Sequence, residues 1–304
     1  MFKGFVCEST REAISPADCL QCARGGALPN CPMTAPVIAG IVAGLRPDDF
    51  EVTVTTLLGC LRKHRLKSPE DYWLRPGESW WAYRGQLMHS ISAQYARNDP
   101  NALAEQRYSM LIETPNGGVQ ISGQPDLVLL DRGHIVDYKT TKCVPRSWKT
   151  YTCPETGALI REGTWAARGK IDCPHCDKGV HDGRTIVKES PPRAYASHRI
   201  QVSCYAALMY ENGVEVNSGE IVYQDMSEQL RIRVDMMPVN DCFALMAERA
   251  SIAMDPVLPD IIRDVDSAWE CDYCPVRNAC ERIHGGPVGK GALIVEEAIA
   301  AQPA

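Results

Sequence analysis

Alternating apolar and polar positions dominate the middle of the chain. Four stretches alternate as β-strands do, and glycine-containing turns at 116–118 and 132–133 separate them: 107–114, 119–123, 126–131 and 134–140. This pattern predicts a three-stranded meander or something close to it. Two further strands are predicted at 216–224 and 229–235.

Helical periodicity flanks these strands. The predicted helices are 53–66, which a threonine caps, then 80–98, 197–213 and 239–254. Helices and strands in this mixed order favour an α/β fold with a central mixed sheet flanked by helices.

The pattern also divides the chain. Between 143 and 192 the periodicity disappears and Cys, Pro and Gly accumulate, which indicates an insertion into the core. We therefore expect a Cys-rich N-terminal segment at 1–50 and a core in two parts, 51–142 and 193–284. The insertion at 143–192 divides the core, and a flexible tail follows at 285–304.

Composition narrows the class of protein. The 304 residues are 45% hydrophobic and 23% charged, as expected for a globular chain. The longest apolar run, at 35–45, is too short and too rich in glycine to span a bilayer, and the N-terminus lacks the apolar region of a signal peptide. We expect a cytoplasmic protein with no membrane partner.

Charge limits where nucleic acid can bind. The net charge is −6, so a binding surface must be a local basic patch. One candidate, at 60–67, contains Arg62, Lys63 and Arg65; the other, at 142–199, has eleven Lys or Arg against six Asp or Glu. A solvated charged face is the alternative for either stretch.

The hairpin at 123–142 carries the most specific chemistry. In a strand, residues two apart share a face, so Asp137 and Lys139 point the same way. Pairing residue 126 with about residue 139 brings Asp126 to them. Two carboxylates and a lysine suit a Mg²⁺ or Mn²⁺ site that activates water, although a salt-bridged surface hairpin is the alternative.

These residues resemble a known family. "GQPD" followed by "DYK" is similar to the signature of the PD-(D/E)xK nucleases, and three further segments resemble the RecB-like branch: "RGQLMH", "QVSCY" and "TTLLGCLRK". The resemblance implies a restriction-endonuclease-like core. It also implies that His89, Asp126, Asp137 and the carbonyl of Tyr138 bind the metal, that Lys139 orients or deprotonates water, and that Gln201 and Tyr205 position the strand or the lysine.

The same resemblance bears on the cysteines. In iron–sulfur members of the branch, one cysteine before the core and three after it hold a 4Fe–4S cluster. Here Cys60 and the C-x₂-C-x₅-C run match that pattern, although four thiolates also suit Zn²⁺: Cys271, Cys274 and Cys280.

Two further cysteine groups have zinc-like spacing. The N-terminal set is Cys7, Cys19, Cys22 and Cys31, whose alternative is a loose, reduced segment. The insertion resembles a zinc ribbon with Cys153, Cys173 and Cys176 as ligands, and its fourth ligand stays open among Cys143, His175 and His181. Cys204 and Cys242 fall in apolar helical patterns and are expected to be buried.

Together these features predict a metal-dependent DNA exonuclease that acts on single strands or DNA ends. Lacking a helicase motif, the chain is most similar to the CRISPR-associated RecB-like exonucleases, with integration proteins or a helicase as implied partners. A phage or mobile-element recombination exonuclease, a non-catalytic DNA-binding scaffold and a zinc-dependent transcription or RNA-processing factor are alternatives. Glu105 is expected to assist through a water, and Trp80–Trp81 and Asp99–Pro100 to stack on bases.

Overall fold

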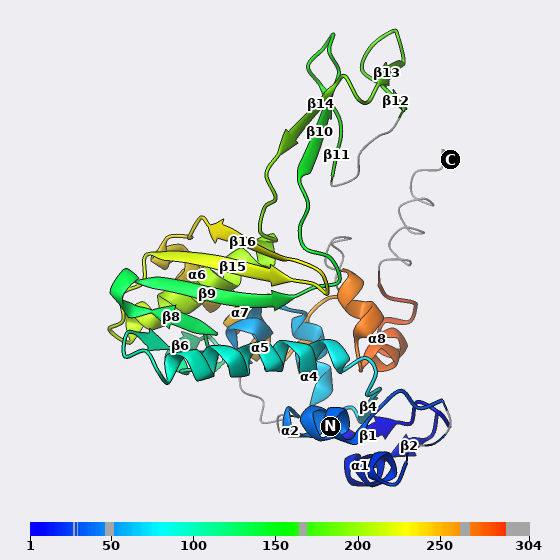
Figure 1. Ribbon diagram of the computed structural model, residues 1–304, viewed down its shortest axis with the longest axis vertical. Coiled ribbons are helices and arrows are strands. Elements are labelled where there is room, and N and C mark those ends of the chain that lie inside the picture. Colours follow the sequence, from blue (N-terminus) through cyan, green and yellow to red (C-terminus); the bar gives the residue numbers. More distant parts are fainter. Residues whose placement is uncertain (27, 29, 46–51, 164–168, 262–267, 290–304) are drawn as a thin grey trace.

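The protein is described by a computed structural model (Figure 1). It describes residues 1–26, 28, 30–45, 52–163, 169–261 and 268–289. It is a mixed α/β structure in which helices flank mixed sheets, as predicted. No helix in these ranges is long and apolar enough to cross a membrane.

The main sheet has five strands in the order β16-β15-β9-β8-β5. Only β15 and β9 run parallel; the other neighbours are antiparallel. The strands are β5 (Ala102–Leu103), β8 (Leu127–Leu129), β9 (His134–Thr140), β15 (Ser218–Gln224) and β16 (Gln229–Val234), and a 3₁₀ turn, η1 (Leu130–Arg132), joins β8 to β9.

A second sheet, β3-β7-β6, corrects the meander prediction. It consists of β3 (Val52–Thr53), β6 (Tyr108–Thr114) and β7 (Gly117–Gly123). After β7 the chain crosses to the main sheet instead of pairing β8 with β7. Gly123 permits the crossing, because a Cβ there would lie 2.8 Å from the side chains of Leu208 and Tyr205.

Two helices enclose the main sheet. α5 (Trp80–Ala96) covers one face, where a small cluster includes Leu127, Val136 and Val222. α6 (Ala196–Glu211) covers the other face and packs on α7 (Val239–Met254). The large core on this second side buries Ile135 and Ile221, so neighbouring residues of β9 and β15 face opposite layers. Cys204 and Cys242 are fully buried, as predicted.

The single helix predicted at 53–66 is wrong. The chain forms α3 (Val54–Leu58) and α4 (Leu61–Lys67), with extended backbone at Gly59 and Cys60. Thr53 caps α3 as expected, accepting a hydrogen bond from the backbone N–H of Thr56. Arg249 donates to the carbonyls of Leu57 and Gly59 at 2.7 Å each, which satisfies groups that the break leaves unpaired.

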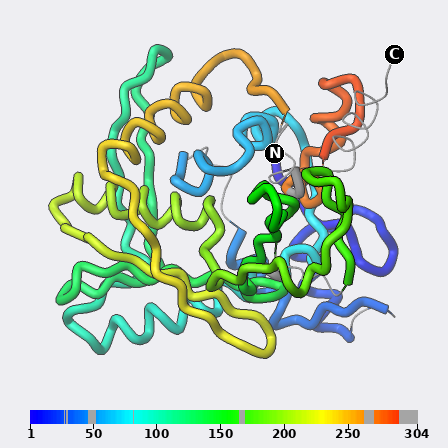
Figure 2. The backbone as a smooth tube through the Cα atoms, turned by 90° about the horizontal axis from the view of Figure 1, so that it is seen from above, coloured from blue at the N-terminus to red at the C-terminus, as the bar shows by residue number. Residues whose placement is uncertain are grey.

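The N-terminal segment is ordered around a small sheet. Its elements are β1 (Phe2–Val6), β2 (Ala13–Ile14), α1 (Pro16–Arg24) and α2 (Ala35–Ala43). β1 pairs with β4 (Tyr72–Leu74), so the segment is joined to the core by a strand. Figure 2 shows this segment, in blue, on the same side of the molecule as the C-terminal helix in red-orange.

The insertion forms an arm that projects from the core (Figure 1). Its strands are β10 (Trp148–Thr152), β11 (Leu159–Gly163), β12 (Lys170–Asp172), β13 (Val180–Asp182) and β14 (Val187–Ser190). β10 pairs with β11 and β14, and β12 pairs with β13.

The C-terminal part closes onto the N-terminal half. It contains η2 (Ala268–Tyr273) and α8 (Arg277–His284). Val288 is buried against Leu66 and Tyr72, so the start of the segment predicted as a flexible tail is packed. The rest of that prediction, 290–304, lies outside the described residues.

Candidate active site and metal-binding groups

The two aspartates of the hairpin meet as predicted, but through a different register. Leu127 pairs with Val136, so residue 126 falls beside residue 137 and not beside residue 139. The N–H of Tyr138 donates to Asp126 Oδ2 at 2.7 Å. Asp126 and Asp137 are 4% and 1% exposed, which excludes the alternative of an exposed salt-bridged hairpin.

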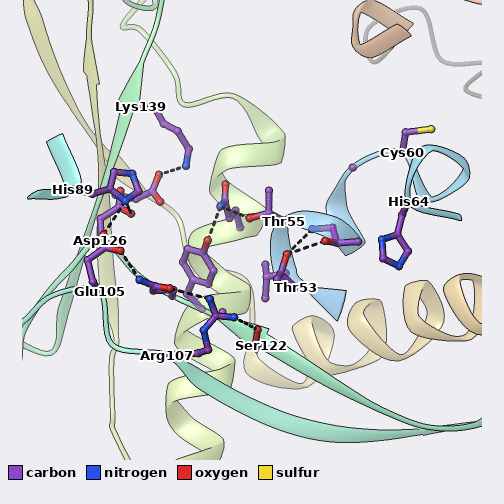
Figure 3. Close-up of a pocket in the computed structure, with 18 of the residues that line it drawn as sticks. Thr53, Thr55, Cys60, His64, His89, Glu105, Arg107, Ser122, Asp126 and Lys139 are labelled. Carbon is purple, nitrogen blue, oxygen red and sulfur yellow. Dashed lines mark hydrogen bonds and ion pairs between the residues drawn. The ribbon is translucent and has the colours of Figure 1, made fainter. Parts of the chain in front are cut away.

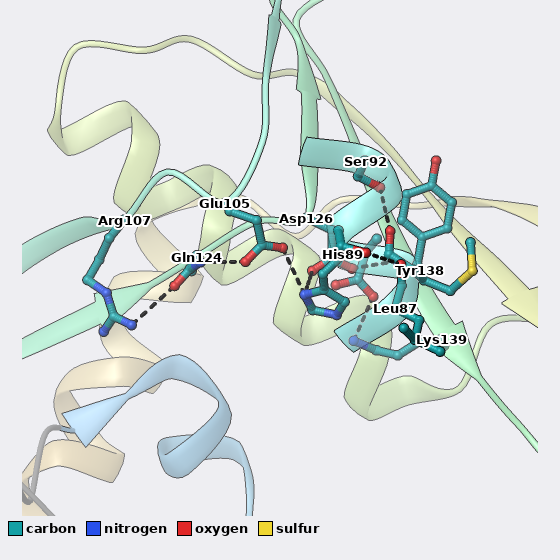
Figure 4. Close-up of polar contacts among 12 residues, drawn as sticks. Leu87, His89, Ser92, Glu105, Arg107, Gln124, Asp126, Tyr138 and Lys139 are labelled. Atoms are coloured by element: carbon teal, nitrogen blue, oxygen red, sulfur yellow. Dashed lines mark hydrogen bonds and ion pairs between the residues drawn. The ribbon is translucent and has the colours of Figure 1, made fainter. Parts of the chain in front are cut away.

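His89 completes a group of possible metal ligands. Its Nδ1 lies 2.8 Å from Glu105 Oε1 and 3.4 Å from Asp126 Oδ1 (Figure 4). Ligand atoms of these three residues all lie within 4.8 Å of one another. The helix α5 supplies His89, while Glu105 lies in the loop between β5 and β6. A metal ion can therefore be bound by groups from three separate parts of the chain.

Glu105 is a candidate metal ligand for which the sequence predicted only an indirect role, through a water. Its backbone has φ +56°, a left-handed conformation that is unusual for glutamate and typical of strained functional sites. This conformation lets the side chain reach His89 directly, so no intervening water is needed for the contact. The sequence signal for this contact was the position of Glu105, three residues before β6.

Polar side chains hold Glu105 in place. Gln124 donates from Nε2 to Glu105 Oε2, and Arg107 donates to Gln124 Oε1 at 3.1 Å. Arg107 also donates to Ser122 Oγ at 3.0 Å. Figure 4 shows this relay running from Arg107 to His89. These hydrogen bonds orient the carboxylate of Glu105, which lies in a loop and not in a strand.

The electrostatics of the group call for a cation. Burial, and then the charge of Asp137, raise the pKa of Asp126 to about 7. Hydrogen bonding to Glu105 raises the pKa of His89. Glu105 Oε1 and Asp137 Oδ2 are buried and form no hydrogen bond of normal geometry, although His89 and Lys139 lie close to them. Both oxygens therefore face positive or proton-carrying groups, the same environment that a bound cation would provide.

Lys139 lies against Asp137, with Nζ 2.7 Å from Oδ2. Burial alone would lower the pKa of Lys139, but the charges of Asp137 and Asp126 outweigh it and raise that pKa. The side chain is therefore an ammonium at neutral pH. Alternation along β9 thus places both residues on one face, as predicted.

Gln201 and Tyr205 share a face of α6. Gln201 donates from Nε2 to Tyr205 Oη at 2.7 Å and to Thr55 Oγ1 at 3.2 Å. Burial and the charge of Asp137 raise the pKa of Tyr205. The pair thus joins α6 to α3 at the edge of the acidic group.

One pocket of about 450 Å³ contains all these groups (Figure 3). His89, Asp126 and Lys139 lie on one side, and Cys60 and His64 lie on the opposite side. Threonines and basic residues line that far wall: Thr53, Thr55, Thr56, Lys63, His64 and Lys67. The pocket therefore has acidic side chains on one side and threonine and basic side chains on the other.

In the basic stretch at 60–67, two arginines hydrogen-bond to other parts of the chain and so stabilise the fold. Arg62 is 8% exposed and donates to Cys280 Sγ at 3.1 Å and to the Pro259 carbonyl at 2.7 Å. Arg65 donates to the carbonyls of Ala253 and Asp255 at the end of α7. We correct the DNA-binding prediction for these two arginines, since their guanidinium groups have protein partners.

Lys63 keeps a place at the pocket. Its Nζ lies 3.2 Å from Glu270 Oε2, which also accepts a hydrogen bond from the N–H of Cys60. The ion pair leaves the lysine on the pocket wall, one-third exposed. Of the three residues predicted to bind DNA, it alone lines the pocket.

Cys60 and the three C-terminal cysteines meet in space. Cys60, Cys271, Cys274 and Cys280 line one narrow cavity of about 20 Å³ between α4 and α8. Burial, and then the charges of Cys60, Cys274 and Cys280, raise the pKa of Cys271 to about 11. More than 200 residues of sequence separate the first cysteine from the others.

The N-terminal cysteines also gather. Burial, and then the charges of Cys31, Cys7 and Cys22, raise the pKa of Cys19 to about 11. Ser15 caps α1, which carries Cys19 and Cys22 on its last two turns. Within the described part of the chain, this set has no three ligand atoms within 4.8 Å of one another.

The arm carries a group of four metal-binding side chains. Cys153, Cys173, Cys176 and His181 offer ligand atoms that all lie within 4.8 Å of one another. His181 is therefore the residue that joins the three cysteines. A metal ion can be held here, as the spacing of the cysteines indicated.

Two other candidates for that fourth position lie elsewhere. His175 Nε2 contacts the Leu159 carbonyl at 3.0 Å. Cys143 is exposed, in the segment between β9 and β10.

Of the residues predicted to stack on bases, Trp80 and Asp99 do not line this pocket, and the side chain of Trp81 lies outside what the structure describes. Trp80 is exposed, and its ring centroid lies 5.7 Å from that of Tyr83. Asp99, which follows α5, accepts hydrogen bonds from Tyr95 and from the N–H of Asn101.

Comparisons with known proteins add little to this geometry. No family model matches the chain, and no curated protein matches it. Ten chains of solved structures match it. One, described as "Crystal structure of SSO0001", is 15% identical, covers 79% of this chain and 91% of its own length, and has a TM-score of 0.48. This likeness is too weak to carry an argument about fold or function.

Proposed function

We propose that this chain is a metal-dependent nuclease that hydrolyses phosphodiester bonds of DNA, built on a RecB-like, restriction-endonuclease-like core. The observation that carries the proposal is the convergence of Asp126, Asp137 and Lys139 with His89 and Glu105 in one pocket. A binding module has no use for buried like charges that raise a carboxyl pKa to about 7.

The residues fit Mg²⁺ or Mn²⁺. These ions prefer carboxylate oxygens, and the pocket offers buried oxygens of Glu105 and Asp137 beside the positive or proton-carrying groups of His89 and Lys139. His89, Asp126 and Asp137 would hold the ion, with Glu105 beside His89 and the carbonyl of Tyr138 as the resemblance implies. The ion would supply charge stabilisation at the phosphate and acidify a bound water.

The other side chains act around that ion. Lys139 is charged at neutral pH, so it orients water or stabilises the phosphate rather than removing a proton. Gln201 and Tyr205, linked to each other, would position the strand or the lysine.

The far wall suggests how DNA would lie. Threonine hydroxyls and Lys63 oppose the acidic side chains across the pocket, and such groups contact phosphates without reading sequence. We propose an exonuclease for single strands or DNA ends. The family resemblance suggests three settings: spacer acquisition with CRISPR integration proteins, action beside a helicase, and recombination in a phage or mobile element.

We also propose that Cys60, Cys271, Cys274 and Cys280 hold a 4Fe–4S cluster. They line one cavity, and one upstream cysteine with the C-x₂-C-x₅-C run matches the cluster pattern of the family that the sequence resembles. Iron analysis of anaerobically purified protein tests this assignment. Cys274→Ser should lose the iron, and a chain that instead holds zinc there would refute the cluster.

The nuclease proposal is tested with end-labelled single-stranded DNA and Mg²⁺ or Mn²⁺. Lys139→Ala should abolish cleavage, while Lys188→Ala, an exposed lysine on β14, should cleave as the wild type does. The position of the label in the products gives the polarity of digestion.

A metal-loaded wild type that cuts no single strand, duplex or fork would reject the nuclease proposal. A non-catalytic DNA-binding scaffold would then be the better explanation. Equal cleavage by Lys139→Ala and the wild type would reject the assigned site even if nuclease activity is present.

A further inference from the structure

The end of the arm contains a compact four-ligand group. Cys176 Sγ lies 3.8 Å from Cys173 Sγ and 3.2 Å from His181 Nε2, and Cys153 Sγ lies 3.6 Å from His181 Nε2. Zn–S bonds of about 2.3 Å and Zn–N bonds of about 2.0 Å in a tetrahedron place neighbouring ligand atoms about 3.5–3.8 Å apart. The observed separations match one tetrahedral ion.

The backbone around the cysteines forms two similar turns. The N–H of Cys153 donates to the Ala158 carbonyl, and the N–H of Cys173 donates to the Gly179 carbonyl, both at 2.8 Å. Gly157 and Gly179 adopt φ of +72° and +64°, which lets each turn close behind its cysteine. Two such turns facing each other are typical of a zinc ribbon.

His181 reaches this group from a strand. It pairs with Ile171 between β12 and β13, and it is 8% exposed. Its Nε2 points at the sulfurs, so the ring is held by the sheet before any metal binds. A buried imidazole between thiols has no other evident partner among the described side chains of the arm.

The arm has little else to hold it together. From β10 to β14, in the described residues 148–163 and 169–190, the buried side chains are Tyr151, Cys153, Ile171, Cys173 and His181, and none of these five belongs to the hydrophobic clusters. Three of these five belong to the four-ligand group. Small folds without a hydrophobic core commonly depend on a structural metal.

We propose that Cys153, Cys173, Cys176 and His181 bind one structural Zn²⁺ that closes the end of the arm. The ion is a single Zn²⁺ and not an iron–sulfur cluster, because four ligand atoms within 4.8 Å of one another leave no room for several irons. The site is complete, with no open position for a substrate. It is independent of the proposed nuclease activity.

The test is the zinc and iron content of the full-length protein, measured by elemental mass spectrometry. Replacing Cys173 and Cys176 together by Ser should lower zinc by about one ion per chain and leave iron unchanged, whatever the N-terminal cysteines bind. The matched control is His175→Ala, which removes a neighbouring imidazole that contacts a carbonyl. It should keep the full zinc content.

Cobalt substitution tests the fourth ligand, and it remains informative if the double variant does not fold. Protein from cells supplied with Co²⁺ should show the intense visible bands of a tetrahedral site. His181→Cys keeps four ligands and should shift the cobalt–thiolate bands, whereas His175→Cys should not. Unchanged zinc in the double variant, loss of iron instead of zinc, or an unchanged cobalt spectrum in His181→Cys would overturn the proposal.

Discussion

The pocket of the core and the end of the arm both gather metal-binding side chains, but they are assembled in different ways. In the pocket, His89 comes from α5, Asp126 directly precedes β8 and Asp137 lies on β9. These elements pack on hydrophobic clusters of the core. The arm draws its ligands from residues 153–181, with almost no apolar support.

This difference separates two uses of a metal. In the pocket, the fold brings the acids together against their own repulsion, and a cation would relieve that repulsion. In the arm, the ligands themselves are the centre of the small fold, so the metal would contribute to folding. Changes in the pocket should therefore affect activity, whereas changes in the arm's ligands should affect local structure.

The largest expected effect is loss of an acidic ligand in the pocket. Asp137→Asn should lower cleavage by about 10²- to 10³-fold, the usual consequence of removing an electrostatic group at a reacting centre. Zinc content should stay at the wild-type value, because the arm is separate. Asp131→Asn, on the exposed turn of the same hairpin, is the control. Parallel loss of zinc would show that the two sites are not independent.

Breaking the relay that holds Glu105 should have a smaller effect. Arg107→Met removes the hydrogen bonds to Gln124 and Ser122 and leaves Glu105 less well oriented. Supporting contacts of this kind typically change metal affinity by about 10- to 100-fold. Titration of activity with Mn²⁺ measures the shift, with Arg132→Met as an exposed control. An unchanged Mn²⁺ requirement would show that the orientation of Glu105 does not matter for metal binding.

The raised pKa of Asp126 predicts how pH acts on the metal-free pocket. Its pKa is about 7 in the fold and 3.8 in the unfolded chain, so the folded state binds the extra proton. This stabilisation is complete below pH 3.8 and is lost as the pH rises towards 7. Thermal melting without Mg²⁺ should show that decline, and Asp126→Asn should reduce it.

The same proton opposes the metal. Below the pKa of about 7, each unit of falling pH should weaken Mg²⁺ affinity by at least about tenfold, since Asp126 must lose a proton before it binds the ion, and His89, whose pKa is also raised, must lose one as well. Calorimetric titration at several pH values checks this slope. A flat profile between pH 5 and 7 would show that Asp126 does not ligate the ion.

The smallest effect on the core should come from removing the arm. Trp148 and Ser190 are antiparallel partners, so residues 149–189 can be replaced by an Asn-Gly turn. Cleavage of short oligonucleotides should change by no more than a few-fold, while zinc falls by about one ion per chain. A larger loss of cleavage, with unchanged melting of the core, would show that the arm handles substrate.

The charges of the arm are consistent with that modest role. Lys149 pairs with Glu189 and Lys178 pairs with Glu155, at 2.8 Å and 2.6 Å. Two of the eleven basic residues at 142–199 are therefore paired within the arm, which weakens the case for DNA binding by these two lysines.

Local patterns predicted several elements and part of the site. Alternation placed Asp137 and Lys139 on one face, because a strand repeats every two residues whatever its partners. The four-residue spacing of Gln201 and Tyr205 likewise predicted their contact on α6. Cysteine spacing indicated three metal-binding groups, since short loops keep neighbouring thiols together.

Other features depended on contacts that no local pattern contains. The sequence by itself determined which residue types are available: hairpin acids, a helical histidine and knuckle cysteines. Only the tertiary structure decided that Arg62 is buried beside Cys280, that Glu105 reaches His89, and that His181 rather than His175 joins the arm's cysteines. The physical reason is that strand register, helix breaks and left-handed residues are set by long-range packing, and these determine where each side chain points.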